Sequence, residues 1–348
     1  MSRRRALIVG IGGQDGSYLA EFLLARDYEV YGLVRHSTAQ APERIAHLAG
    51  RVALLRGDLV DQLSLNAAID SARPHEVYNF GGTSFVPESW QQPGLTAELT
   101  GLGVVRLLES IRLADPTIRF YQASTSEMFG RPAAAPQTEA TPFDPQNPYA
   151  VAKVFGHQMV ERYRDGFGLF AVSGILYNHE SPRRGVEFVT RKITHAVARI
   201  ALGLEHEVLL GDLSASRDWG FAGDYIRAMW LMLQQDEASS YVVATGELHS
   251  VQDVAEVAFA RAGLDWRDHV RVDERFVRPK DATAHLVGDA ARARDDLDWH
   301  PSVDFEQLIH LMVDADLART DGERGHDPEM DWPASEIPQW SDGARRPR

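Results

Sequence analysis

The chain has 348 residues, of which 44% are apolar and 25% charged, and its formal net charge is −14. These values are typical of a well-packed globular protein and leave room for one large domain or two domains that share an interface. The negative charge argues against a general nucleic-acid binder, and the absence of cysteine excludes disulfides and thiolate metal sites.

The N-terminal arginines at positions 3–5 precede an apolar run, Ala6–Ile11, that is only as long as a strand and ends in glycines. This differs from the longer apolar region of a secretion signal. No apolar run approaches the roughly 20 residues that a membrane span requires. We therefore expect a cytoplasmic protein without membrane attachment.

From residue 6 onward, short β-branched runs alternate with helical stretches. Strands are predicted at 6–9, 29–34, 52–55, 76–80 and 119–123, with helices at 17–26 and from about 94 to 113. This alternation is typical of a parallel sheet with helices on both faces. With right-handed crossovers, it predicts an α/β fold with a Rossmann-type, doubly wound parallel sheet.

After about residue 180 the alternation becomes irregular, and short apolar runs at 209–211, 241–245 and 281–287 interrupt the helices. We predict a dinucleotide-binding domain at 1–180 that carries the catalytic residues. A smaller α/β region at 181–320 is expected to bind the substrate, with room for one of its strands or helices to return to the first domain. Residues 321–348 are polar and proline-rich and are expected to form a loose tail.

The first predicted strand runs into a turn with Gly10, Gly13 and Gly16 in G-x-x-G-x-x-G spacing. Glycines let the backbone approach a pyrophosphate, and the N-terminus of the next helix directs its amide groups at the negative charge. A tight turn without a ligand is the alternative. The position between strand and helix favours a dinucleotide site.

The end of the second predicted strand indicates which dinucleotide binds. Arg35 stands there without a neighbouring acid, which favours the 2′-phosphate of NADP over NAD, with NAD kept as the alternative. Asp58 and Leu59 follow the third strand and are expected near the adenine. The alternative for Asp58 is a helix cap.

Tyr149 and Lys153 stand four residues apart on a predicted helix, downstream of Thr125 and Glu127 at the end of the fifth strand. Side chains at i and i+4 lie on one helix face, so the ammonium can stabilise a tyrosinate. A phenol with a pKa near 10 needs such help to act as a base. A chance Tyr-x-x-x-Lys on an amphipathic helix is the alternative, but the preceding glycine-rich turn favours catalysis.

Several strings that include these residues carry a family resemblance. They lie at 13–19, 122–130, 148–153, 178–185, 188–193 and 217–220. On these strings the chain resembles the extended short-chain dehydrogenase/reductase superfamily, and within it is most similar to the GDP-mannose 4,6-dehydratases, over nearly all of residues 5–320. The resemblance implies a lyase that converts GDP-mannose to GDP-4-keto-6-deoxymannose, with internal hydride transfer from C4 to C6 through bound NADP.

The resemblance also implies roles for the catalytic residues. Tyr149 takes the proton of the sugar O4 hydroxyl, with Lys153 beside it, while Thr125 hydrogen-bonds the same oxygen. Glu127 removes the C5 proton and then assists departure of the C6 hydroxyl as water. An epimerase of this superfamily oxidises and re-reduces one carbon and needs no such carboxylate, so Glu127 distinguishes a dehydratase. The alternative is that Glu127 faces solvent and has no catalytic role.

Binding residues follow from the turn, the strand ends and the resemblance together. For the cofactor they are Gly10, Gly13, Gln14, Asp15, Gly16, Arg35, Asp58, Leu59, Phe80, Gly81, Gly82, Ser84, Tyr149, Lys153, His179 and Arg184. For the substrate they are Ser84, Glu88, Asn178, Val189, Lys192, Arg217, Arg278 and Asp281, the two arginines at the diphosphate. A surface salt bridge is the alternative for each arginine. No metal site is expected.

The chain departs from the family pattern at several of these positions. Gly12 replaces a usual threonine, and with the glycines at 81 and 82 it makes the cofactor loops more flexible. Glu88 replaces a small residue near the hexose. An epimerase, or a 4,6-dehydratase of another nucleotide sugar, is therefore the second hypothesis, and a non-catalytic dinucleotide sensor is the third. The resemblance further implies a homodimer or homotetramer in which the segment around Arg35 to Arg44 reaches a neighbour's cofactor.

Overall fold

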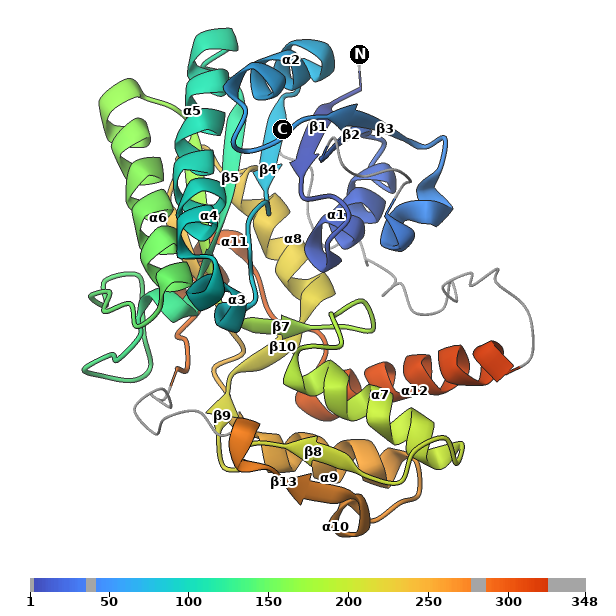
Figure 1. The fold of residues 1–348 in the computed structure, drawn as a ribbon. Coiled ribbons are helices and arrows are strands. Elements are labelled where there is room, and N and C mark those ends of the chain that lie inside the picture. Colours follow the sequence, from blue (N-terminus) through green and yellow to red (C-terminus); the bar gives the residue numbers. More distant parts are fainter. Residues whose placement is uncertain (1–2, 36–41, 277–285, 325–348) are drawn as a thin grey trace.

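The computed structural model describes residues 3–35, 42–276 and 286–324 and is built around one seven-stranded parallel sheet (Figure 1). The strand order is β3-β2-β1-β4-β5-β6-β11. The strands are β1 Arg5–Val9, β2 Glu29–Val34, β3 Val52–Arg56, β4 Glu76–Asn79, β5 Arg119–Thr125, β6 Ala171–Leu176 and β11 Ser240–Val243. This is the doubly wound order, so the predicted Rossmann-type class is confirmed.

Helices cover both faces of the sheet. On one face lie α1 (Gln14–Leu24), α8 (Ala222–Met232) and α11 (Ala291–Leu297), and on the other lie α2 (Gln62–Ala72), α5 (Gly103–Ala114) and α6 (Pro148–Phe167). Alternation along β1 divides its side chains between them, since Ile8 packs with the first set and Leu7 with the second. Both sheet faces are therefore buried, as expected of parallel strands.

The predicted helix at 94–113 is not a single α-helix. Pro93 opens a short α4 (Pro93–Thr96), a π-helical segment η2 (Ala97–Leu102) follows, and α5 begins at Gly103. A Cβ at Gly103 would lie 3.0 Å from Leu59, so glycine permits this close packing. A shorter helix, α3 (Val86–Gln91), precedes the group.

A second group of elements, here called the C-terminal lobe, lies beyond the carboxyl ends of the strands (Figure 1). It contains α7 Val189–Ala201, α9 Val251–Arg261, α10 Trp266–His269, α12 Phe305–Arg324, and the strands β8 Val208–Leu210, β9 Ser216–Arg217, β12 His249–Ser250 and β13 Val270–Val272. Its own apolar cluster includes Ile193, Val254, Phe259 and Ile309. The strands β7 (Asn178–Glu180) and β10 (Trp219–Phe221) pair in parallel between the sheet and this lobe.

The chain does not divide at a single point between sheet and lobe. Strand β11, inside the region predicted as the smaller one, pairs with β6 of the main sheet, and α8 packs against α1. The boundaries predicted at 180 and 320 stay predictions. The final helix α12 continues through Arg324 and so includes the first four residues of the predicted loose tail; no proline lies between Pro301 and Pro328 to interrupt it. The rest of the tail lies outside the described residues.

Among the described helices, none combines the length and the apolar character needed to cross a bilayer. The cytoplasmic location stays a prediction. Three short 3₁₀ segments complete the fold: η1 (Glu43–Leu48), η3 (Ser126–Met128) and η4 (Glu274–Phe276).

Candidate active site

A cleft of about 1260 Å³ lies at the carboxyl ends of the sheet strands, between the sheet and the C-terminal lobe. Ligands of doubly wound folds bind at this edge. All predicted catalytic, cofactor-binding and substrate-binding residues within the described ranges line it. Arg278 and Asp281 lie outside the described residues. The cleft therefore brings together groups that are far apart in sequence.

The glycine-rich turn after β1 has the shape that a pyrophosphate requires. Gly10 has φ +85°, and a Cβ at Gly16 would stand 2.4 Å from the Gly10 carbonyl oxygen, so neither position tolerates another residue without rearrangement. Gly13 is the N-cap of α1 and provides no side-chain cap for the first amide groups of the helix. These amides face the cleft and fit the phosphates of a dinucleotide.

Gly12 allows a close packing contact. A Cβ at this position would come within 2.6 Å of Pro42, which also lines the cleft. Pro42, from another loop, thus occupies the space that a side chain at position 12 would take. Asp58 also lines the cleft, and α2 is capped instead by Asp61, which accepts from the Leu63 and Ser64 amides. The helix-cap alternative for Asp58 is therefore wrong.

The predicted catalytic residues come from β5, η3 and the start of α6. Thr125 caps η3, and its Oγ1 accepts the Glu127 amide at 3.2 Å. Tyr149 and Lys153 lie in α6 and are both buried. The Lys153 ammonium lies 5.7 Å from the Tyr149 ring centroid and donates to the Ala123 carbonyl at 2.7 Å.

The pKa values of this pair are set mainly by burial. Burial raises the pKa of Tyr149 to about 12, against a hydrogen bond with Thr125 and the positive charge of Arg184. Burial also lowers the pKa of Lys153 to about 8, against the attraction of Asp15. Thr125 and Arg184 therefore favour the tyrosinate here, while the Lys153 ammonium is held by a backbone carbonyl.

Asn147 is a site residue that the sequence analysis did not assign. Its Oδ1 accepts the Ala150 amide at 2.8 Å as the N-cap of α6, and its Nδ2 donates to the Glu127 carboxylate at 3.2 Å. The sequence contains a signal for the first contact, because Asn before Pro is a typical helix start. The second contact depends on tertiary structure.

Several of the residues predicted to bind the substrate lie on β7, β9 and α7, where these elements line the cleft. Asn178, Val189 and Lys192 lie there, and the Lys192 ammonium stands 4.1 Å over the Phe276 ring. Burial lowers the pKa of Lys192, against the attraction of Asp273.

Arg217 is followed by the fully buried Asp218, a second residue without a sequence assignment. This carboxylate accepts from the Thr245 hydroxyl at 2.6 Å and from the Thr245, Gly246 and Gly288 amides at 2.9, 2.9 and 3.2 Å. It ties three chain segments together beside Arg217.

Glu88 is exposed and lies in the first turn of α3, at the rim of the same cleft. Next to this helix, the rings of Phe85 and Phe188 meet edge to face with centroids 5.8 Å apart, and Arg184 stacks on Phe188 at 3.6 Å. This contact joins the loop after β4 to the start of α7 across the cleft.

His179 and Asp15 form a further contact across the cleft. His179 Nε2 lies 2.9 Å from Asp15 Oδ2, and Nδ1 lies 2.8 Å from the Tyr177 carbonyl oxygen. In the segment predicted to reach a neighbouring subunit, Arg44 donates to the Arg183 carbonyl of the same chain at 2.8 Å.

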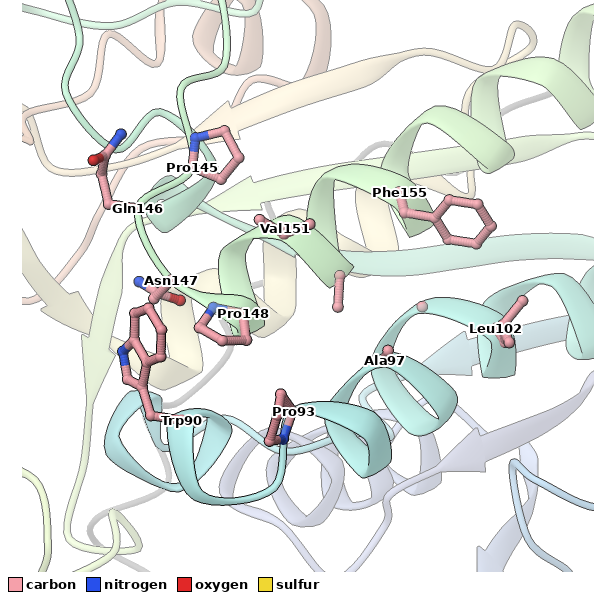
Figure 2. A pocket seen from close by; sticks show the side chains of 12 residues that line it. Trp90, Pro93, Ala97, Leu102, Pro145, Gln146, Asn147, Pro148, Val151 and Phe155 are labelled. Atoms are coloured by element: carbon pink, nitrogen blue, oxygen red, sulfur yellow. The ribbon is translucent and has the colours of Figure 1, made fainter.

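A second hollow of about 660 Å³ lies outside the cleft, between α3, α4 and η2 on one side and the start of α6 on the other. Figure 2 shows Trp90, Pro93, Leu102, Val151 and Phe155 around this groove. None of the described residues that line it is an acid or a base, so it is not a site of proton transfer. In the described ranges, no group of three or more His, Asp or Glu side chains could hold a metal ion.

Known proteins are similar to this chain over most of its length. The model of the family described as GDP-mannose 4,6 dehydratase matches residues 7–312. GDP-mannose 4,6 dehydratase 2 of Arabidopsis thaliana is 49% identical over 327 residues, covering 90% of this chain and 87% of the relative.

Among solved structures, UDP-glucose 4-epimerase of Thermus thermophilus in complex with NAD is similar at a TM-score of 0.78 and 27% identity, covering 90% of this chain and 98% of that one. RMD of Pseudomonas aeruginosa complexed with NADPH is similar in fold at a TM-score of 0.76 and 24% identity, covering 90% and 99%.

Proposed function

Because the chain belongs to the GDP-mannose 4,6-dehydratase family and dehydrates GDP-mannose, we propose that this reaction takes place in the cleft between the sheet and the C-terminal lobe. The family assignment also implies that the protein uses a nicotinamide dinucleotide cofactor. When bound, this cofactor supplies the hydride chemistry, by which hydride leaves C4 of the mannose and returns to C6. The residues of the chain position the sugar and move the protons.

Tyr149 takes the proton from the O4 hydroxyl, and Thr125 holds the same oxygen. The hydrogen bond between Thr125 and Tyr149 supports this assignment, because it favours the ionised phenol. Lys153, with a pKa of about 8, places a positive charge beside the ring over the neutral range. Oxidation at C4 then makes the C5 proton acidic.

Glu127 removes the C5 proton and delivers it to the departing C6 hydroxyl, which leaves as water; C5 takes up a proton again when C6 is reduced, which balances the proton that left O4. The proposal depends on two hydrogen bonds to Glu127. The Asn147 side chain donates to the Glu127 carboxylate, and the Glu127 backbone amide donates to the Thr125 hydroxyl. These contacts hold the carboxylate beside Tyr149 in one cleft, an arrangement that elimination needs and epimerisation at one carbon does not.

Incubation with GDP-mannose tests this assignment. We expect a product that has lost one water, detected by mass spectrometry, and no such product from UDP- or dTDP-hexoses. A product of unchanged mass would instead support an epimerase. Loss of water only from a different sugar nucleotide would assign the cleft to another 4,6-dehydratase, with Glu88 as the residue to exchange first.

We propose NADP as the preferred dinucleotide, because Arg35 follows β2 at the edge of the cleft, where a 2′-phosphate would lie. Arg35→Ala should weaken NADP binding by about tenfold and leave NAD binding nearly unchanged, since a charge-assisted contact to the extra phosphate is lost. Arg51→Ala is the matched control, because Arg51 is exposed and does not line the cleft. Equal effects on both dinucleotides would contradict the NADP assignment.

For the substrate, we propose that Arg217 binds the diphosphate and that Asn178, Val189 and Lys192 contact the nucleotide portion. Their shared position in the lining of the cleft, on β7, α7 and β9, supports this division. Arginine suits a diphosphate because its planar guanidinium donates two parallel hydrogen bonds. From the sequence alone, we propose that Arg278 binds the same diphosphate and that Asp281 binds the ribose.

We also propose a homodimer or homotetramer. The groove in Figure 2 supports it, because the exposed fractions of Trp90, Val151 and Phe155 are 64%, 54% and 41%, and a second copy would cover them. Val151→Asp should shift the sedimenting mass toward a single chain. Leu63→Asp is the matched control, since Leu63 is 78% exposed on α2, away from the groove, and should leave the mass unchanged.

A further inference from the structure

The contact between Asp15 and His179 joins two segments that are distant in the sequence but adjacent in the cleft. Asp15 lies in the first turn of α1, directly after the glycine-rich turn, and His179 lies in β7. Their side chains are only 18% and 11% exposed. The pair is therefore largely removed from water, at the place where the proposed cofactor site borders the substrate side.

The hydrogen-bond geometry determines the protonation of His179. Its Nδ1 faces the Tyr177 carbonyl oxygen, which only accepts hydrogen bonds, and its Nε2 faces the Asp15 carboxylate, which also only accepts when ionised. Both ring nitrogens must therefore carry a proton. Burial opposes the charge, but Asp15 raises the pKa of His179 above its ordinary value, and His179 in turn holds the pKa of Asp15 at about 2 although burial alone would raise it.

Other charged and titratable groups surround the pair. Arg184 adds positive charge from the loop after β7, and Glu180, the last residue of β7, partly offsets it at 3.3 Å. Tyr225 of α8 stacks on the imidazole, with ring centroids 4.8 Å apart. Tyr121 of β5 and Tyr149 and Lys153 of α6 feel the Asp15 charge. None of these groups replaces the direct contact at Asp15.

Asp15 presents an electrostatic difficulty for the proposed cofactor site. The start of α1 attracts anions through its free amides and helix dipole, yet a carboxylate in the same turn repels a pyrophosphate. A neutralising cation in direct contact removes that repulsion. We propose that His179 is a positioning residue whose imidazolium neutralises Asp15, so that the glycine-rich turn accepts the dinucleotide, and that cofactor binding weakens when His179 loses its proton.

This inference rests on the cofactor site proposed above. A second, uncharged link makes it testable without disrupting the fold. Nε2 of the Gln14 side chain donates to the His179 carbonyl at 3.1 Å and also to Asp15 Oδ1 at 3.0 Å, and its Oε1 accepts from the Ser181 hydroxyl at 2.8 Å. The bonds to the His179 carbonyl and the Ser181 hydroxyl do not involve the imidazole, so they can hold α1 against the segment after β7 when the ion pair is lost.

The test is a double-mutant cycle on NAD binding by the full chain, measured by isothermal titration calorimetry. NAD is the probe because it lacks the 2′-phosphate of NADP, which titrates itself. His179→Gln leaves Asp15 unpaired and should weaken binding by about tenfold or more. Asp15→Asn in the His179→Gln background should restore most of that loss, because the repelling charge is gone. Additive losses, or no restoration, would overturn the proposal.

The dependence of binding on pH separates an electrostatic role from a merely structural one. In the wild type, the dissociation constant should rise as pH increases through the raised pKa of His179. Asp15→Asn should move this rise to lower pH, and His179→Gln should remove it while leaving any contribution of Lys153. Identical profiles in the wild type and His179→Gln would contradict the role assigned to His179.

A measurement without cofactor completes the design. Nitrogen NMR of the ¹⁵N-histidine-labelled chain at neutral pH should show a signal of a histidine with both ring nitrogens protonated that is missing in His179→Gln and has a lower pKa in Asp15→Asn. A neutral His179 in the wild type would refute the inference. A wild type that binds neither NAD nor NADP would contradict the proposed function instead, so the two failures are distinguishable.

Discussion

Replacing Asn147 should separate the stability of the fold from the rate of the reaction, because its two hydrogen bonds serve different purposes. The bond from Asn147 Oδ1 to the Ala150 amide caps α6, and the bond from Nδ2 to Glu127 orients the carboxylate. Loss of an N-cap typically costs about 1 kcal/mol of folding free energy. A hydrogen bond to a charged group contributes about 1.5–3 kcal/mol. At 3.2 Å and half-buried, the contact to Glu127 belongs at the lower end, which corresponds to about tenfold in rate.

Three substitutions use this difference. Asn147→Ser keeps a capping oxygen but loses the amide donor, so its melting temperature should fall less than that of Asn147→Ala while kcat falls about tenfold. Asn147→Ala loses both bonds and should also melt about 2 °C lower. Asn147→Asp keeps the cap but places a second carboxylate beside Glu127. The two negative charges repel each other, and the amide donor to Glu127 is lost, so kcat should fall at least as far as in Asn147→Ser.

The assays are thermal unfolding followed by circular dichroism, and water loss from GDP-mannose followed by mass spectrometry over a range of pH. Asn147→Ser with wild-type kcat would refute the assignment of Asn147 to Glu127. If Asn147→Ser melted at as low a temperature as Asn147→Ala, this would refute the assignment of helix capping to one hydrogen bond and carboxylate orientation to the other.

Three other substitutions test the proposed roles. Glu127→Gln should allow oxidation at C4 without loss of water, so reduced nicotinamide would be seen by absorbance and the dehydrated product would be absent from mass spectra; normal dehydration would contradict its role as the base. Lys153 loses its ammonium charge as pH rises through its lowered pKa of about 8, so the kcat/KM of the wild type should fall above that pH. Lys153→Arg stays charged and should remove this fall. An unchanged pH profile in Lys153→Arg would exclude Lys153 as the source of the fall. Arg217→Ala should raise KM for GDP-mannose by about tenfold. Arg261→Ala is the control and should leave KM unchanged, because Arg261 forms an exposed ion pair with Asp314 outside the cleft. Equal KM values in both variants would contradict a contact between Arg217 and the diphosphate.

The parts of the fold that local pattern determines were predictable. The spacing of Gly10, Gly13 and Gly16 reports a backbone requirement, since a side chain at Gly16 would collide with the Gly10 carbonyl. The Tyr149–Lys153 spacing reports a shared helix face. The family predicted from these strings is confirmed by the family match over residues 7–312. The individual site roles stay predictions.

Contacts between distant segments were not predictable from local pattern. Asp218 lies in the string 217–220, which indicates the family but no partner for the carboxylate, and only the folded chain brings Thr245 and Gly288 to it. Strand β11 reads as a buried apolar run, but its place beside β6 depends on the packing of α8 and α11 around it. Pro42 opposite Gly12 is a similar case, because neither position indicates the other.

The return of β11 to the main sheet limits how the protein can open and how it unfolds. The chain leaves the sheet after β6, returns for α8 and β11, and leaves again for β12 and α9. Substrate entry by a hinge would have to bend several crossing segments together, so we expect exchange of sugar nucleotide through side-chain and loop movement at the cleft rim. The same crossings predict that a single cut by a protease will not release the C-terminal lobe as a separate folded fragment, and that heating will melt sheet and lobe in one transition.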